Sequence, residues 1–257
     1  MAGSVVRISI APVKSLHLVH PEEIELTRAG VVGDRRFWLS DADGRLANGK
    51  RFPQLMQIRP EWDEAERRLT FALPNGERID GVVELGAPVE TTLYRTPHPS
   101  RRVGGPWEAA ISELAGEPLT LLWSERGAVD RGNDRGGWAT IVSRASLERL
   151  GAEAGSAAPD GRQFRMLFEI DGVRAHEEDE WIGAHVQVGE AVVAPLGDVG
   201  RCVVTTKNPD TGEFAFPTLD TLAGYRREGV KEPLPLGIYC DVVEPGRVRV
   251  GDPVAVA

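Results

Sequence analysis

The sequence contains two cysteines in different surroundings. Cys202 follows Gly200 and Arg201, whereas Cys240 lies in Gly-Ile-Tyr-Cys-Asp-Val-Val, a run typical of an ordinary strand. Soft thiolates bind soft metals, and a neighbouring arginine favours the thiolate form. Most free cysteines are nevertheless packed in a core without a chemical role. The residues alone therefore leave Cys202 open between a metal ligand and a core residue.

Basic residues at two places could hold an anion. Lys14 and Ser15 follow a strand-like run, where an ammonium, a hydroxyl and backbone N–H groups can together bind a phosphate. Arg35 precedes an aromatic strand-like run, and a guanidinium suits bidentate phosphate contact. Taken singly, each of these patterns is more typical of a solvated surface. On a chain of net charge −9, an anionic ligand must be held by a few local cations of this kind.

Composition excludes several other functions. No run of Lys or Arg has the character of a nucleic-acid footprint, so we expect no nucleic-acid partner. No apolar run approaches the ~20 residues that span a bilayer, and the start of the chain lacks a signal-peptide pattern. We therefore expect no membrane partner and, with only two cysteines, a cytoplasmic location. The acidic run at 176–181 matches no zinc motif and is interpreted as a solvated loop.

Alternating residues and frequent turn signals predict a mainly β chain. Val6, Ile8 and Ile10 are expected to share one strand face. Asp43-Gly44 and Pro74-Asn75-Gly76 predict tight turns after strands. Residues 199–206 are expected to form a strand, with Cys202 on one face of it.

Three peripheral helices are expected from capping signals. The first begins near Pro106 and ends at Gly116. The second begins after Ser143 as N-cap and ends at Gly151. The third begins at Thr218, with apolar residues at near-helical spacing. Together the elements fit two β-rich units that meet between residues 90 and 105.

An ordered series of motifs resembles one family, the MOSC proteins. The first part of the chain is similar to the N-terminal β-barrel domain that accompanies MOSC domains, through Pro12-Val13-Lys14-Ser15, Gly33-Asp34-Arg35-Arg36-Phe37-Trp38-Leu39, Asp43-Gly44 and Lys50-Arg51-Phe52-Pro53. The remainder is similar to the MOSC domain itself, through Ser143-Arg144-Ala145-Ser146-Leu147, Phe164-Arg165, Glu177-Glu178-Asp179 with Trp181, Arg201-Cys202-Val203-Val204-Thr205-Thr206, Pro209-Asp210-Thr211-Gly212 and Gly251-Asp252-Pro253-Val254. The layout most resembles the amidoxime-reducing branch.

This resemblance implies two β-barrel-like units, residues 1–95 and 96–257, with helices on the outside. It also implies a molybdenum cofactor (molybdenum–molybdopterin) bound between the two domains. Cys202 matches the cysteine that ligates the metal and is the implied catalytic residue. The other implied cofactor-binding residues are Lys14, Ser15 and Arg35 at the phosphate end, together with Lys50, Ser143, Arg165, Arg201 and Thr205. Three positions depart from the family pattern: Met166-Leu167 replaces Pro-Asn, Asn48 and Lys50 replace the threonine and arginine of Thr-x-Arg-Gln, and Leu236 replaces a phenylalanine.

The resemblance also implies an activity. A small N-hydroxylated substrate, such as a hydroxylamine or amidoxime, would be reduced with electrons from a separate ferredoxin, flavoprotein or haem protein. An iron–sulfur cluster within this chain is not expected, because it needs more than the two cysteines present. Two alternatives remain at this stage: a carrier of sulfur or molybdenum cofactor on Cys202, and a binding module in which Cys202 is only a core residue.

Overall fold

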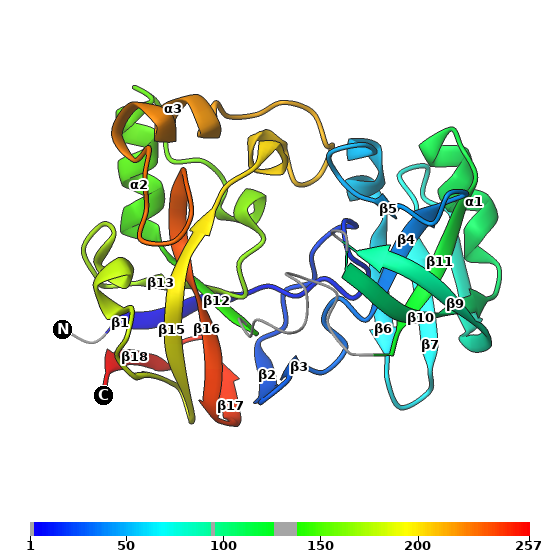
Figure 1. Cartoon of the computed structure of the whole chain (residues 1–257), viewed down its shortest axis with the longest axis horizontal. Coiled ribbons are helices and arrows are strands. Elements are labelled where there is room, and N and C mark those ends of the chain that lie inside the picture. Colours follow the sequence, from blue (N-terminus) through cyan, green and yellow to red (C-terminus); the bar gives the residue numbers. More distant parts are fainter. Residues whose placement is uncertain (1–2, 94–95, 126–137) are drawn as a thin grey trace.

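Two β-rich units lie side by side in the computed structural model, which describes residues 3–93, 96–125 and 138–257 (Figure 1). The helices lie on the outside, and both ends of the chain are at the same unit (Figure 1). The predicted class, mainly β with peripheral helices, is confirmed. Among the described residues, no helix is long and apolar enough to cross a membrane.

One unit is a closed seven-stranded barrel. In order around the barrel its strands are β1 (Gly3–Ile8), β13 (Phe168–Asp171), β12 (Ala139–Ser143), β16 (Pro235–Glu244), β15 (Ala191–Gly200), β14 (Val186–Val188) and β18 (Pro253–Val256). Its interior is filled mainly by aliphatic side chains, and Phe168 and Cys240 lie in the same core. Alternate residues of these strands point inward, which is how a small barrel fills its centre.

The other unit contains two sheets over a second core. The five-stranded sheet has the order β5 (Leu46–Ala47), β4 (Phe37–Asp41), β11 (Leu119–Ser124), β10 (Thr96–Gly104) and β9 (Glu84–Leu93). The three-stranded sheet is β6 (Arg59–Asp63), β7 (Arg68–Ala72) and β8 (Arg78–Val82). Phe37 and Phe71, one from each sheet, lie in the same core cluster. Among the described strands, only the seven-stranded sheet of the first-described unit closes into a barrel.

Strand pairing divides the chain differently from the predicted boundary between residues 95 and 96. That boundary falls between β9 and β10, which pair with each other as an antiparallel hairpin. β1 belongs to the barrel, and β2 (Glu23–Thr27) pairs with β17 (Gly246–Arg249) and with β3 (Gly30–Val31). The β1–β13 and β2–β17 pairings join residues more than 150 positions apart, and local sequence patterns carry no information about them.

The predicted face of β1 is wrong by one residue. Val5 and Ile8 are fully buried, whereas Val6 is only partly buried, because the register shifts between Val5 and Arg7 where β1 pairs with β13. A β-bulge inserts one extra residue, so the inward-facing set changes parity at that point.

The three helices form where capping residues predicted them. They are α1 (Trp107–Ala115), α2 (Arg144–Glu153) and α3 (Thr218–Tyr225). Gly116 closes α1 in the left-handed conformation, and the Ser143 hydroxyl caps α2 by accepting from the Ser146 N–H. α2 does not end at Gly151 as predicted. A Cβ there would lie 2.6 Å from the Ala158 nitrogen, so this glycine allows close chain approach and does not end the helix.

Candidate functional site

Cys202 lies on the connection that leaves the barrel at the end of β15. It is half-buried, has an extended backbone, and precedes a 3-10 turn, η4 (Val203–Thr206). The prediction that 199–206 is one strand is therefore wrong beyond Gly200. The Thr205 and Thr206 hydroxyls donate to the Cys202 and Val203 carbonyls, at 2.9 and 2.8 Å. Such local bonds satisfy carbonyls that would otherwise need a neighbouring strand.

Lys14 and Ser15 lie beside Arg35, although twenty residues separate them in sequence. The Lys14 N–H donates to the Phe37 carbonyl at 2.8 Å, and the Arg35 N–H donates to the Ala11 carbonyl at 2.7 Å. Lys14 and Ser15 are buried, and less than a tenth of the surface of each is exposed. The two segments thus run alongside each other and place an ammonium, a hydroxyl and a guanidinium in one region, as an anion site requires.

Backbone conformation singles out the same residues. Among described non-glycine residues, six have a positive φ, and three of them are the predicted site residues Ser15 (76°), Arg35 (48°) and Arg165 (54°). This conformation is uncommon outside glycine and is found repeatedly at ligand sites, where surrounding structure holds it in place. Sequence patterns gave no signal for it.

Arg165 connects these segments to one another. Its guanidinium donates to the Leu16 carbonyl at 2.8 Å, and its own carbonyl accepts from the Arg35 guanidinium at 3.0 Å. Arg201, next to Cys202, donates to the Phe164 carbonyl at 3.2 Å and to the Leu236 carbonyl. The predicted residues Lys14, Ser15, Arg35, Arg165, Arg201 and Cys202, together called the candidate site below, therefore come from four segments that contact one another.

The remaining predicted residues have different positions. Thr205 is nearly buried and bonds to the Cys202 carbonyl, so it shapes the Cys202 loop. Lys50 is exposed on a turn whose neighbour Gly49 packs against Val204, within η4. Ser143 is fully buried at the N-terminus of α2, and its hydroxyl donates to Glu178 at 3.0 Å. A cofactor contact by Ser143 is not supported, because its hydroxyl is buried and donates to Glu178.

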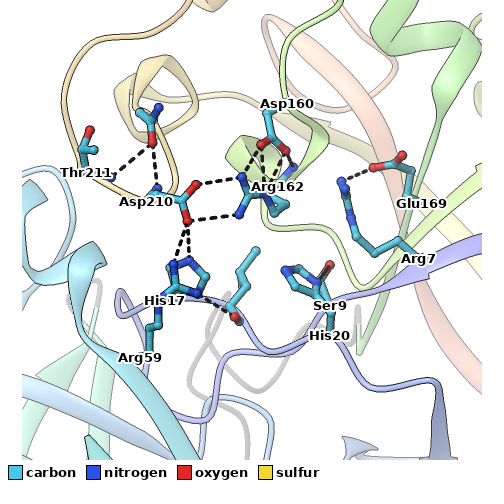
Figure 2. Close-up of polar contacts among 12 residues, drawn as sticks. Arg7, Ser9, His17, His20, Arg59, Asp160, Arg162, Glu169, Asp210 and Thr211 are labelled. Carbon is cyan, nitrogen blue, oxygen red and sulfur yellow. Dashed lines mark hydrogen bonds and ion pairs between the residues drawn. The ribbon is translucent and has the colours of Figure 1, made fainter. Parts of the chain in front are cut away.

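Sequence reasoning missed an ion-pair centre beside the candidate site. Asp210 accepts hydrogen bonds from His17, Arg59 and Arg162 at 2.8 to 3.2 Å (Figure 2). The bonds from Arg162 and His17 lower the pKa of the Asp210 carboxyl to about 2. Residues 209–212 carry a motif of the family resemblance, and nothing in their pattern indicates partners so distant in sequence.

The acidic run at 176–181 is only partly the solvated loop predicted from sequence. It forms a 3-10 turn, η3 (Glu177–Trp181), in which Glu178 and Trp181 are buried. The Glu178 carboxylate accepts from the Ser143 N–H and hydroxyl and from the Ser146 hydroxyl, at 2.7 to 3.1 Å. Burial raises the pKa of the Glu178 carboxyl, although the bond from Ser146 opposes this. The residue is a structural acceptor within the barrel unit.

His176, which precedes η3, makes stability depend on pH. Burial, reinforced by Arg226 and Arg149, lowers the pKa of its imidazole to about 4. Between its ordinary value near 6.5 and about 4, the unfolded chain binds a proton that the folded protein does not. Stability is therefore lost as pH falls through this window. Asparagine tolerates the left-handed backbone of this position. We therefore expect His176→Asn to reduce the loss of folding stability between about pH 7 and about pH 5 by about 2 kcal/mol.

Urea unfolding of both proteins at the two pH values measures this difference. His185→Asn is the matched control, because His185 is exposed, and it should leave the pH dependence of wild type unchanged. Equal pH dependence in wild type and His176→Asn would show that His176 titrates normally.

A surface cavity is lined by Asp179, Asp198, Tyr225, Arg226, Arg227, Glu228, Gly229 and Val230. None of these residues was predicted to bind cofactor. Two of its three carboxylates are engaged by protein groups: Asp198 accepts the N–H groups of residues 230–232, and Asp179 pairs with Arg226.

The donor set around Cys202 limits which metal it could hold. Among the described residues, no group of three or more His, Cys, Asp or Glu side chains could bind a metal ion. A metal bound here would therefore need most of its ligands from an organic cofactor, with Cys202 as the protein ligand. A molybdenum–pterin dithiolene fits, since molybdenum favours sulfur and the anionic group would meet the cations Lys14, Arg165 and Arg35, of which Arg35 also pairs with Asp34.

Family models and known proteins are similar to this chain over most of its length. A family model described as "MOSC N-terminal beta barrel domain" matches residues 2–99, and one described as "MOSC domain" matches residues 137–255. Human mitochondrial amidoxime reducing component 2 is 39% identical, over 98% of this chain and 83% of its own. Human mitochondrial amidoxime-reducing component 1 is 27% identical, and the match covers 98% of this chain and 82% of that protein. A molybdenum cofactor sulfurase from Oryza sativa subsp. japonica is 26% identical, over 92% of this chain and 32% of its own.

Proposed function

Because this chain belongs to the MOSC family, with an N-terminal MOSC β-barrel domain ahead of the MOSC domain, we propose that it is a molybdenum-cofactor enzyme that reduces N-hydroxylated compounds. The observation that carries the proposal is the convergence of Cys202 with the Lys14, Arg35 and Arg165 segments at the junction of the two units. The relatives named amidoxime-reducing components support the substrate class at family level.

Each side chain of the candidate site would have a defined role. Cys202 would supply the protein thiolate to molybdenum. Lys14, Ser15 and Arg35 would hold the phosphate of the cofactor, with Arg165 as a further contact. Arg201 bonds to backbone carbonyls at Phe164 and Leu236, so it would also hold the Cys202 loop in position.

The cofactor, when bound, supplies the two-electron redox chemistry that removes the N-hydroxyl oxygen. The protein binds and orients it. Cys202 is half-buried, so part of its surface remains accessible. Electrons would come from a separate ferredoxin, flavoprotein or haem protein, because the two cysteines of this chain are too few for an iron–sulfur cluster. A small N-hydroxylated molecule would be the substrate.

The test uses protein produced in a host that makes the cofactor. Molybdenum and pterin are quantified per chain, and benzamidoxime or a hydroxylamine is supplied with a strong artificial reductant. We expect near-stoichiometric molybdenum and conversion to the amidine or amine. Full molybdenum loading without reduction of any tested N-hydroxylated compound would contradict the proposed substrate class.

The alternative is a carrier of sulfur or cofactor, which the likeness to a molybdenum cofactor sulfurase favours in part. The chain spans about a third of that relative's length, so the whole activity of the relative cannot be assigned to it. Intact-mass measurement after gentle purification distinguishes the two. A sulfur atom added at Cys202 in protein that lacks molybdenum would support the carrier.

A further inference from the structure

Asp210 bonds to His17 and Arg162, which lie close in sequence to Ser15 and Arg165 of the candidate site (Figure 2). It is at the tip of the 208–213 turn, which follows Cys202 and η4 along the chain. The Asn208 side chain preorganises this turn by accepting from the Asp210 and Thr211 N–H groups, at 2.8 and 3.1 Å. Local bonds therefore order the backbone that carries the Asp210 side chain.

Each oxygen of the carboxylate bonds to another segment. Oδ1 accepts from His17 Nε2 at 2.8 Å, and His17 lies two residues beyond Ser15. Both oxygens accept from Arg162, at 3.1 and 2.8 Å, and Arg162 lies in the 3-10 turn η2 (Gly161–Phe164) that ends at Arg165. Asp160 holds the same guanidinium from its other side. Paired forks of this kind fix orientation as well as distance.

The turn that carries Asp210 also contacts the unit that contains β6. Arg59, at the start of β6, donates to Oδ1 at 3.2 Å, and Gln57 donates to the Thr211 carbonyl at 3.3 Å. A Cβ on Gly212 would lie 2.1 Å from the Pro53 carbonyl oxygen, so the two backbones are in direct contact. Only a glycine, which here has a φ of 77°, permits this approach.

We propose that Asp210 is the positioning residue of the candidate site: one carboxylate sets the Cys202 loop, the Lys14–Ser15 segment and the Arg165 turn relative to one another. It does not touch the reacting atoms. The assignment of a cofactor to this site rests on the proposed function, but the mechanical link between the three segments does not.

The test is hydrogen–deuterium exchange on the full chain as purified, comparing wild type with Asp210→Asn. The variant keeps the size of the side chain and removes the charge. We expect amides in three separate segments, 14–20, 160–167 and 203–213, to exchange faster by about tenfold, corresponding to a local loss of about 1.4 kcal/mol. Asp80→Asn is the control, since Asp80 pairs with Arg68 and Thr70 within one sheet, and it should leave these three segments unchanged.

Arg162→Gln provides a second variant if Asp210→Asn does not fold, because it removes only the Arg162 contacts. It should loosen the same three segments, and its effect also includes the loss of the bonds to Asp160. Faster exchange confined to 208–213 in both variants would overturn the inference.

Cofactor retention separates this inference from the proposed function. In loaded protein, the variant should release pterin at least about tenfold faster than wild type, and the molybdenum X-ray absorption spectrum should broaden because the thiolate is less well ordered. Wild type that never contains molybdenum would contradict the proposed function, and the exchange experiment would still decide the role of Asp210.

Discussion

Cys202→Ser is expected to lower N-reductive activity by more than about 100-fold and to remove most of the bound molybdenum. The physical reason is the donor set. Cys202 is the one cysteine at the junction of the units, and the described residues offer no other cluster of metal ligands. A serine hydroxyl is a hard and weakly acidic ligand that replaces a soft thiolate poorly on molybdenum. Molybdenum content, sulfur coordination by X-ray absorption, and amidoxime reduction are measured on the same sample.

Cys240→Ala is the matched control for this substitution. Cys240 is fully buried in the barrel core, and burial raises the pKa of its thiol, so it stays protonated. Its replacement should cost about 1–2 kcal/mol of stability and leave molybdenum content unchanged. Cys202→Ser should leave stability within about 1 kcal/mol, since this residue is only half-buried. Undiminished molybdenum with the same number of sulfur ligands in Cys202→Ser would refute the assignment.

Glu178→Ala is expected to produce the largest loss of stability, about 4 kcal/mol. The carboxylate is completely buried and accepts three hydrogen bonds from Ser143 and Ser146. Its removal leaves those donors buried without an acceptor and opens a cavity between α2 and η3. A loss of this size corresponds to a fall in Tm of roughly 10 °C for a chain of this length.

The neighbouring Glu180→Ala controls for the general effect of removing an acidic residue here. Glu180 is exposed and pairs with Arg174 at 3.1 Å, a contact worth at most about 0.5 kcal/mol. Thermal and urea unfolding of both variants give the comparison. Similar stability of Glu178→Ala and wild type would mean that water replaces the carboxylate and that the buried network is dispensable.

Several features were determined by local sequence. The tight turns at Gly44 and Gly76 form because these residues adopt positive φ, and α1 and α2 use the caps predicted at Gly116 and Ser143. Cys240 lies in a buried strand, as its apolar neighbours indicated. Each of these depends on residues within about one turn or strand of each other, where propensity and hydrogen bonding act directly.

The candidate site was only partly predictable. The ordered motifs identified Cys202, Lys14, Arg35 and Arg165 through their resemblance to a family, but no residue pattern predicted their contacts. The same limit applies to Glu178, whose buried role is hidden within an acidic run.

Tertiary structure alone decided how the parts meet. It placed β1 in the barrel with strands more than 160 residues later, and it brought Asp210 to His17 and Arg162. It also fixed Ser15, Arg35 and Arg165 in a backbone conformation that their own side chains disfavour. The physical reason is common to all three. Pairing across long loops and local strain are offset by burial and hydrogen bonds summed over the whole fold, and no short stretch of sequence contains that sum.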